Sequence, residues 1–154
     1  MGPYEAPLGV IVQSAKYGPH LGAADALARR LGEALRGWAD VDAVVPVPIP
    51  ATRRWRRGFC QGERLARGVA AATGMPQRLL LTRRPGLTQV GQRAEARRRL
   101  PVSAFTVCEV AVPQRVLLVD DVRTTGATLH AAARALLRRG VRHIWAATVC
   151  FQGE

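Results

Sequence analysis

The sequence contains a single lysine, Lys16, among its 23 basic residues. A Walker A phosphate loop needs a lysine after its last glycine, and a receiver-type acidic pocket would want a lysine on a later strand, so neither site is expected. A G-x-G-x-x-G dinucleotide fingerprint is also missing. The three cysteines, Cys60, Cys108 and Cys150, are widely spaced and form no C-x-x-C pair. They predict buried or incidental thiols rather than a zinc ribbon or a disulfide framework.

Long hydrophobic runs and a secretory leader are lacking too. No apolar run approaches the roughly 20 residues that a bilayer span needs. The first residues, MGPYEAPLG, show no basic region followed by an apolar one. We therefore expect a cytoplasmic protein with no membrane span. The 154 residues, 48% of them hydrophobic, fit a single domain over 1–154 with one core.

Acidic residues are few, 11 against 23 basic ones, which gives a net charge of +12. Such a surplus favours anionic partners: phosphates, nucleotides or nucleic acid. A basic surface that is merely solvated would have the same composition, so the charge alone leaves both interpretations open. Aromatic side chains, on which single-stranded nucleic acid stacks, occur in a basic run only at Trp55 and Phe59.

The spacing of apolar residues predicts an α/β protein. Helical spacing predicts helices over residues 7–17, 21–38, 62–73 and 127–139. Short apolar runs predict strands over residues 42–48, 78–82, 104–108, 114–120 and 143–151, and residues 49–61 have the composition of a loop. Strands and helices alternate in the second half, so we expect a central, mainly parallel sheet flanked by helices and joined by right-handed crossovers.

Two features refine this expectation. The helix over 127–139 should end at Gly140 and bury one face, made of Leu129, Ala132, Ala133, Leu136 and Leu137. Residues 83–103 contain many arginines and few apolar residues, which is long for a connection inside a compact domain. Connections of that kind are usually lids or disordered segments, although residues 92–100 could form a short helix.

The most informative segment is RVLLVDDVRTTGATLHAA, residues 115–132, in which a buried strand leads into Asp120 and Asp121. In open α/β sheets, ligands bind beyond the carboxyl ends of the strands. Residues 124–128 form the turn into the next helix, where unpaired backbone N–H groups and the positive end of the dipole attract anions. Small residues let a phosphate approach these groups closely, and threonine hydroxyls add donors.

The two carboxylates cannot serve the same phosphate, because like charges repel. They suit hydroxyl donors, such as the two vicinal hydroxyls of a ribose, or a hydrated magnesium ion. Capping by one Asp and turn formation by one Thr would not explain a carboxylate pair at a strand end, where desolvation is costly. The segment therefore indicates a ribose 5-phosphate site. Adjacent strand residues point to opposite faces, so both acids can reach one ligand only if the backbone turns there.

The segment VLLVDDVRTTGAT resembles the phosphoribosyl pyrophosphate (PRPP) signature of type I phosphoribosyltransferases. VVPVPIPATRRWRRGFCQGERLA and LTQVGQRAEARRRLPVSAF add a resemblance to one branch, the ComF competence-protein family, over nearly the whole chain. Three departures stand out. Many family members begin with a cysteine-rich zinc module, which this sequence does not show. The family usually has asparagine where Cys60 and Leu100 stand, and Arg123 replaces a residue that is commonly apolar.

The resemblance implies a type I phosphoribosyltransferase-like fold with a flexible hood at about 83–103. It implies that Asp120 and Asp121 accept hydrogen bonds from the ribose hydroxyls. The 5-phosphate would be held by Thr124, Thr125, Gly126, Ala127 and Thr128. Arg53 and Arg57 would hold pyrophosphate, with Arg57 favoured because Gly58 and Phe59 follow it, and Gln89 and Arg97 would act in the hood. No direct protein metal site is expected; Mg²⁺ would come with PRPP, with Asp120 and Asp121 as its nearest protein groups.

These expectations leave three functions open. The first is a Mg²⁺-dependent transferase that moves phosphoribose from PRPP to a nitrogen acceptor and releases pyrophosphate. The second is a non-catalytic accessory of competence and DNA uptake that binds single-stranded DNA or nucleotides. The third is a PRPP sensor without turnover. Purine salvage is less expected, because purine-salvage relatives have an acid at the position of Thr124. Relatives are often homodimers, which the resemblance extends to this chain only by analogy.

Overall fold

A computed structural model describes residues 21–37, 41–85, 100–108 and 111–151 of the chain. The helix expected over residues 7–17 and the short helix within 92–100 lie outside these ranges. In chain order, the described elements are α2 (Leu21–Ala34), β1 (Ala43–Pro46), α3 (Ala51–Arg57), α4 (Gln61–Thr73), β2 (Leu81–Arg83), the 3₁₀ turn η2 (Val102–Ala104), β3 (Phe105–Val107), β4 (Arg115–Arg123), α5 (Ala127–Leu137) and β5 (His143–Phe151).

In the described part of the chain, three parallel strands form the central sheet, in the order β1-β4-β5. Ala43 lies opposite Val116 in the first pair, and the second pair runs in register from Arg115 opposite His143 to Arg123 opposite Phe151. An isolated parallel bridge between Val44 and Gln77 continues the sheet beyond β1. β2 and β3 pair antiparallel as a separate ribbon.

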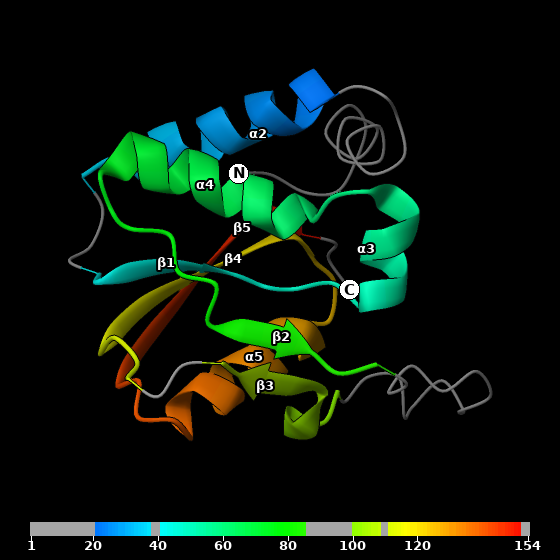
Figure 1. The fold of residues 1–154 in the computed structure, drawn as a ribbon. Coiled ribbons are helices and arrows are strands. Elements are labelled where there is room, and N and C mark those ends of the chain that lie inside the picture. The colour runs from blue at the N-terminus through cyan, green and yellow to red at the C-terminus, as the bar shows by residue number, and fades with distance from the viewer. Residues whose placement is uncertain (1–20, 38–40, 86–99, 109–110, 152–154) are drawn as a thin grey trace.

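The sheet is covered on both faces, as Figure 1 shows: α2 and α4 lie on one side, and α5 lies on the other with the β2–β3 ribbon. Side chains alternate along a strand, and β4 follows this rule. Leu117 and Val119 pack into the core cluster under α2 and α4, whereas Val116 and Leu118 pack into the cluster under α5. All four are fully buried. The predicted α/β class with a parallel sheet is confirmed.

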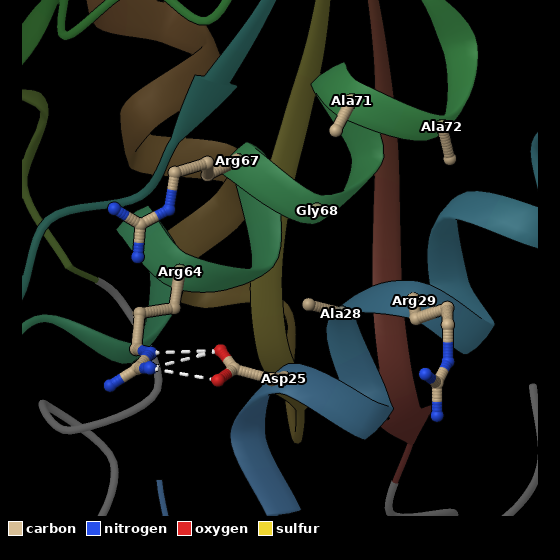
Figure 2. A pocket seen from close by; sticks show the side chains of 8 residues that line it. All are labelled: Asp25, Ala28, Arg29, Arg64, Arg67, Gly68, Ala71 and Ala72. Carbon is tan, nitrogen blue, oxygen red and sulfur yellow. Dashed lines mark hydrogen bonds and ion pairs between the residues drawn. The ribbon is translucent and has the colours of Figure 1, made fainter. Parts of the chain in front are cut away.

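Helices α2 and α4 approach each other closely because small residues line their contact. A Cβ on Gly68 would lie 2.5 Å from the Cβ of Ala28, and one on Gly32 would lie 2.6 Å from the Cβ of Ala72. Figure 2 shows the groove above this contact, where Arg64 of α4 donates to both carboxylate oxygens of Asp25 on α2, at 3.2 and 3.0 Å. Small residues and this ion pair together fix α2 on α4.

The predicted loop over residues 49–61 is wrong in part, because it contains helix α3. The helix begins after Pro50 and ends at Gly58, which takes the left-handed conformation with φ 76° and donates its N–H to the Arg54 carbonyl at 2.9 Å. No residue of α3 belongs to either core cluster, and Trp55 is 91% exposed. A helix without a buried face leaves no apolar periodicity in the sequence.

Other boundaries also differ from expectation. β4 continues past the expected end at Asp120 as far as Arg123, and β2 begins at Leu81 rather than at residue 78. In α5, Leu137 was expected inside but is 48% exposed, and Ala131 and Ala135 are buried instead. The cysteines are free thiols, of which Cys60 and Cys150 are buried and Cys108 is exposed. Within the described ranges, no helix combines the length and hydrophobicity needed to cross a membrane.

Candidate phosphoribosyl site

Asp120 and Asp121 lie near the carboxyl end of β4 and are half-buried. The backbone N–H of Asp121 donates to Oδ1 of Asp120 at 2.9 Å, and the N–H of Val122 donates to Oδ1 of Asp121 at 2.8 Å. Each bond fixes the carboxylate against the following peptide unit. A carboxylate offers about four lone-pair positions, and each of these bonds uses one of them.

The alternation of side chains along β4 changes beside the acid pair. Val119 packs under α2 and α4, and so does Val122, three residues later, although a regular strand would send the two to opposite faces. On β5, the adjacent residues Val149 and Cys150 likewise both belong to that cluster. The regular alternation that would separate the two carboxylates onto opposite faces is therefore interrupted where they stand.

The turn that follows brings residues 124–128 to the N-terminus of α5. Gly126 is the N-cap, with φ 75° in the left-handed region that glycine adopts most easily, and its carbonyl accepts from the N–H of His130 at 2.9 Å. Thr124 and Thr125 are exposed, and Thr128 is half-buried. The first turn of α5 contains no acidic residue. An anion at this helix start would meet backbone N–H groups and threonine hydroxyls and no opposing carboxylate on that turn.

Arg83, the last residue of β2, is half-buried. Its burial lowers the pKa of its guanidinium, the positive charge of Arg53 lowers that pKa further, and the negative charge of Asp120 raises it. The guanidinium also lies 5.1 Å from the centre of the Phe105 ring. The charges of Arg53 and Asp120 thus both act on the Arg83 guanidinium, in opposite directions. In the sequence, Arg83 was only the first residue of the segment expected to form the hood, without a role of its own.

A cavity of about 210 Å³ opens between the β1–α3 connection and β2. Its walls include Pro46, Pro48 and Ile49 on one side and Thr82 with Arg83 on the other. Arg54 of α3 pairs with Glu63 of α4 at 2.6 Å on the same cavity wall. The cavity lies along the connection after β1, the segment to which the resemblance assigns pyrophosphate.

Some predicted site residues cannot be placed in this arrangement. Arg57 is the last residue of α3, and its side chain lies outside the described part of the structure. Gln89 and Arg97 lie outside the described residues, and the expected hood is described only at 83–85 and 100–103. The roles of these three residues therefore stay predictions.

The carboxylates suit a magnesium ion that a substrate brings with it. Among the described residues there is no group of three or more His, Cys, Asp or Glu side chains that could form a protein cage for a metal. Mg²⁺ usually keeps several waters and binds through one or two carboxylates together with substrate phosphates. The half-buried pair of Asp120 and Asp121 fits that mode.

Comparisons with known proteins identify the family. The model described as Phosphoribosyl transferase domain matches residues 109–154, which include the acid pair and the turn into α5. Over 155 residues, the chain is 33% identical to Competence protein F of Haemophilus influenzae, covering 94% of this chain and 68% of that protein. The chain belongs to the ComF competence-protein family. This ComF chain is also 32% identical to the DNA utilization protein YhgH of Salmonella typhi, covering 96% and 68% of the two chains.

Solved structures show the fold of the ComF chain to be that of type I phosphoribosyltransferases. Glutamine PRPP amidotransferase from B. subtilis, complexed with ADP and GMP, superposes with a TM-score of 0.59 at 20% identity. The match covers 90% of this chain but only 30% of the amidotransferase chain. Orotate phosphoribosyltransferase of Mycobacterium tuberculosis gives a TM-score of 0.52 at 19% identity, covering 89% of this chain and 64% of the other.

Proposed function

We propose that this ComF chain binds PRPP with Mg²⁺ and transfers phosphoribose to a nitrogen acceptor, releasing pyrophosphate. The observation that carries the proposal is the half-buried pair of Asp120 and Asp121 near the carboxyl end of β4, followed by the N-terminus of α5 at Gly126. Carboxylates and a helix N-terminus at one edge of the sheet match a ligand that carries both hydroxyls and phosphates. The membership of the family and the fold of its neighbours support the same ligand.

In this proposal, the N-terminus of α5 binds the 5-phosphate. The N–H groups that have no partner within the helix donate to the phosphate oxygens, and Thr124, Thr125 and Thr128 add hydroxyl donors. The left-handed Gly126 lets the main chain approach the phosphate without a Cβ in the way. Asp120 and Asp121 then accept hydrogen bonds from the ribose hydroxyls. These contacts fix both ends of the sugar and expose its C1.

Transfer passes through an oxocarbenium-like state while negative charge builds on the departing pyrophosphate. Arg53 and Arg83 stabilise that charge, and each charge-assisted contact contributes about 1.5–3 kcal/mol. Asp120 and Asp121 are the residues that would hold a Mg²⁺ ion, which would supply positive charge against the leaving group. The acceptor nitrogen attacks C1 directly, so no protein nucleophile is required. The hood would exclude water during the step.

Calorimetry with PRPP and Mg²⁺ tests the proposal. Wild type should bind, and Asp120→Asn should bind at least about tenfold more weakly, since it loses a charge-assisted hydrogen bond. Asp25→Asn is the matched control, because Asp25 lies on α2 and its carboxylate is already paired with Arg64 of α4. Failure of the wild type to bind PRPP would refute both the transferase and the sensor. Pyrophosphate release over a panel of nitrogen acceptors then separates turnover from sensing.

A second candidate function is binding of single-stranded DNA, which the exposure of Trp55 favours. Its side chain is 91% exposed on α3, between Arg54 and Arg56, and both arginines are exposed as well. An aromatic side chain flanked by cations suits base stacking beside phosphate contacts. Gel shifts with an oligothymidine should show affinity that falls with rising salt and falls further in Trp55→Ala. Affinity that is independent of salt and of Trp55 would dismiss this function.

A further inference from the structure

The side chain of Gln61 is the one buried polar group within the described part of the chain, with only 2% of its surface exposed. Neither its Nε2 nor its Oε1 has a hydrogen-bond partner there. A buried carboxamide without partners reduces stability, because it gives up its bonds to water and gains none in return. Such a group in a native fold calls for a function that outweighs this loss.

Gln61 is the first residue of helix α4 and lies on the helix face that covers the sheet. One and two turns later, Leu65 and Val69 of the same face pack into the core cluster with Leu117 and Val119 of β4. Helix side chains lean toward the N-terminus of their helix. The Gln61 side chain therefore extends from the core toward the carboxyl ends of the strands.

The neighbouring Gly62 fixes how close this helix start lies to the candidate site. A Cβ on Gly62 would lie 2.8 Å from the carbonyl oxygen of Val47 and 3.8 Å from that of Val119. Val47 follows β1 directly, and Val119 precedes Asp120 in β4. The first turn of α4 thus rests on the ends of both strands, at the edge of the sheet that carries the acid pair.

The N-terminus of α4 also provides positive potential at this place. The helix has 13 residues, and its N-cap Cys60 makes no side-chain hydrogen bond to it. The acid in its first turn, Glu63, accepts both guanidinium hydrogen bonds of Arg54, at 2.6 and 3.2 Å. The negative charge of Glu63 is therefore already matched, and the helix start stays favourable for an anion.

We propose that the carboxamide of Gln61 binds the ligand of this site, with Nε2 donating to an oxygen of pyrophosphate. The proposal rests on the proposed function and adds a contact that the signature around Asp120 does not contain. The protein leaves this amide unpaired in the free state, and the ligand supplies its partner. The unpaired amide of Gln61 destabilises the free protein, and the hydrogen bond that it gains on binding increases the affinity for the pyrophosphoryl group.

Two variants, Gln61→Met and Gln61→Leu, replace the amide by an apolar side chain of similar size. Because they remove an unpaired polar group, the free protein should unfold at a midpoint raised by about 2–8 °C. Calorimetry should show binding of Mg²⁺-pyrophosphate and Mg²⁺-PRPP weakened about tenfold or more. Binding of ribose 5-phosphate, which lacks the pyrophosphoryl group, should stay unchanged.

Gln77→Met is the matched control, because Gln77 is half-buried but its Nε2 donates to the Glu63 carbonyl at 2.9 Å. Loss of that satisfied bond should lower the unfolding midpoint and leave pyrophosphate binding unchanged. Unaltered pyrophosphate affinity in both Gln61 variants overturns the inference, whatever their midpoints, and leaves the proposed function standing. A wild type that binds neither PRPP nor pyrophosphate overturns both.

Discussion

Arg115 donates three hydrogen bonds to the carboxylate of Asp42 at the amino ends of β1 and β4, the end of the sheet opposite the candidate site. Its Nε and one terminal nitrogen donate to Oδ1 at 3.1 and 2.7 Å, and its backbone N–H donates to Oδ2 at 2.9 Å. The backbone N–H of Asp42 donates in turn to the Arg115 carbonyl at 2.9 Å. These four bonds set the register in which β1 enters the sheet.

The first prediction follows from the hydrogen bonds of Arg115, which lower the pKa of Asp42 below its usual value of 3.8. A depressed pKa in the folded state means that this pair stabilises the fold above pH 3.8 and that the contribution is lost as pH falls through the folded-state pKa. Asp42→Asn should unfold at a lower temperature than wild type at pH 7. The difference should narrow steadily below pH 4. A difference that stays constant down to pH 2 would contradict the assignment.

A second prediction concerns the contact between α2 and α4. Gly68→Ala places a Cβ 2.5 Å from that of Ala28 and 2.9 Å from the Ala28 backbone carbon, so the helices must separate. Overpacking of this kind costs about 1–3 kcal/mol of unfolding free energy, measurable by urea titration. Gly22→Ala is the control, since Gly22 lies on α2 with nothing within 4 Å of the added Cβ. It should gain about 0.5–1 kcal/mol. Equal losses at both positions would count against close helix packing.

The third prediction compares the effects of backbone strain and of lost ligand binding at two glycines, one at each end of α5. Gly126 and Gly140 have φ 75° and 101°, and alanine is strained at both angles by about 1–2 kcal/mol. Both Gly→Ala variants should therefore lose stability. Only Gly126→Ala, at the N-terminus, should also weaken PRPP binding, by about tenfold. Comparable affinity loss in Gly140→Ala would show that the effect arises from the whole helix rather than from its phosphate-facing end.

The fourth prediction tests Arg83. Arg83→Gln keeps most of the side-chain length but removes the charge that lies near Asp120, so affinity for pyrophosphate should fall about tenfold or more. Loss of the contact with the Phe105 ring should cost a further 0.5–1 kcal/mol or so in stability. Arg142→Gln is the control, because Arg142 is exposed just before β5, at the amino end of the sheet. Its pyrophosphate affinity should equal that of wild type, and a similar loss there would point to net charge alone.

The elements that the sequence predicted well are those that bury a continuous apolar surface. β5 was expected over residues 143–151 and has those bounds, and α4 begins one residue before its expected start. The core residues of α4 recur at helical spacing, and β5 is an almost continuous apolar run. The prediction that Leu137 is buried was wrong, because α5 buries the small residues Ala131 and Ala135 instead. An alanine marks the buried face of a helix less clearly in the sequence than a leucine does.

The rest depended on interactions that periodicity does not report. α3 has no buried face, so its signals were only Pro50 before it and Gly58 after it. β4 extends past Asp120 because its backbone continues to pair with β5 as far as Phe151. For the site, the acid pair and the turn into α5 could be found from the sequence, whereas Arg83 could not, since its role depends on a neighbour 37 positions away in the chain that only folding brings near it.

Helix α3 stands apart from both halves of the core, attached through Arg54 to Glu63 and by its two flanking connections. Residues outside the hydrophobic core can be substituted with little loss of folding stability. Selection on α3 can then act on the molecules that its exposed surface binds. The strands of the sheet, in contrast, stay constrained by packing. Across the family, substitutions in α3 at positions other than Arg53 and Arg57 should follow the partner of each member more closely than they follow its thermal stability.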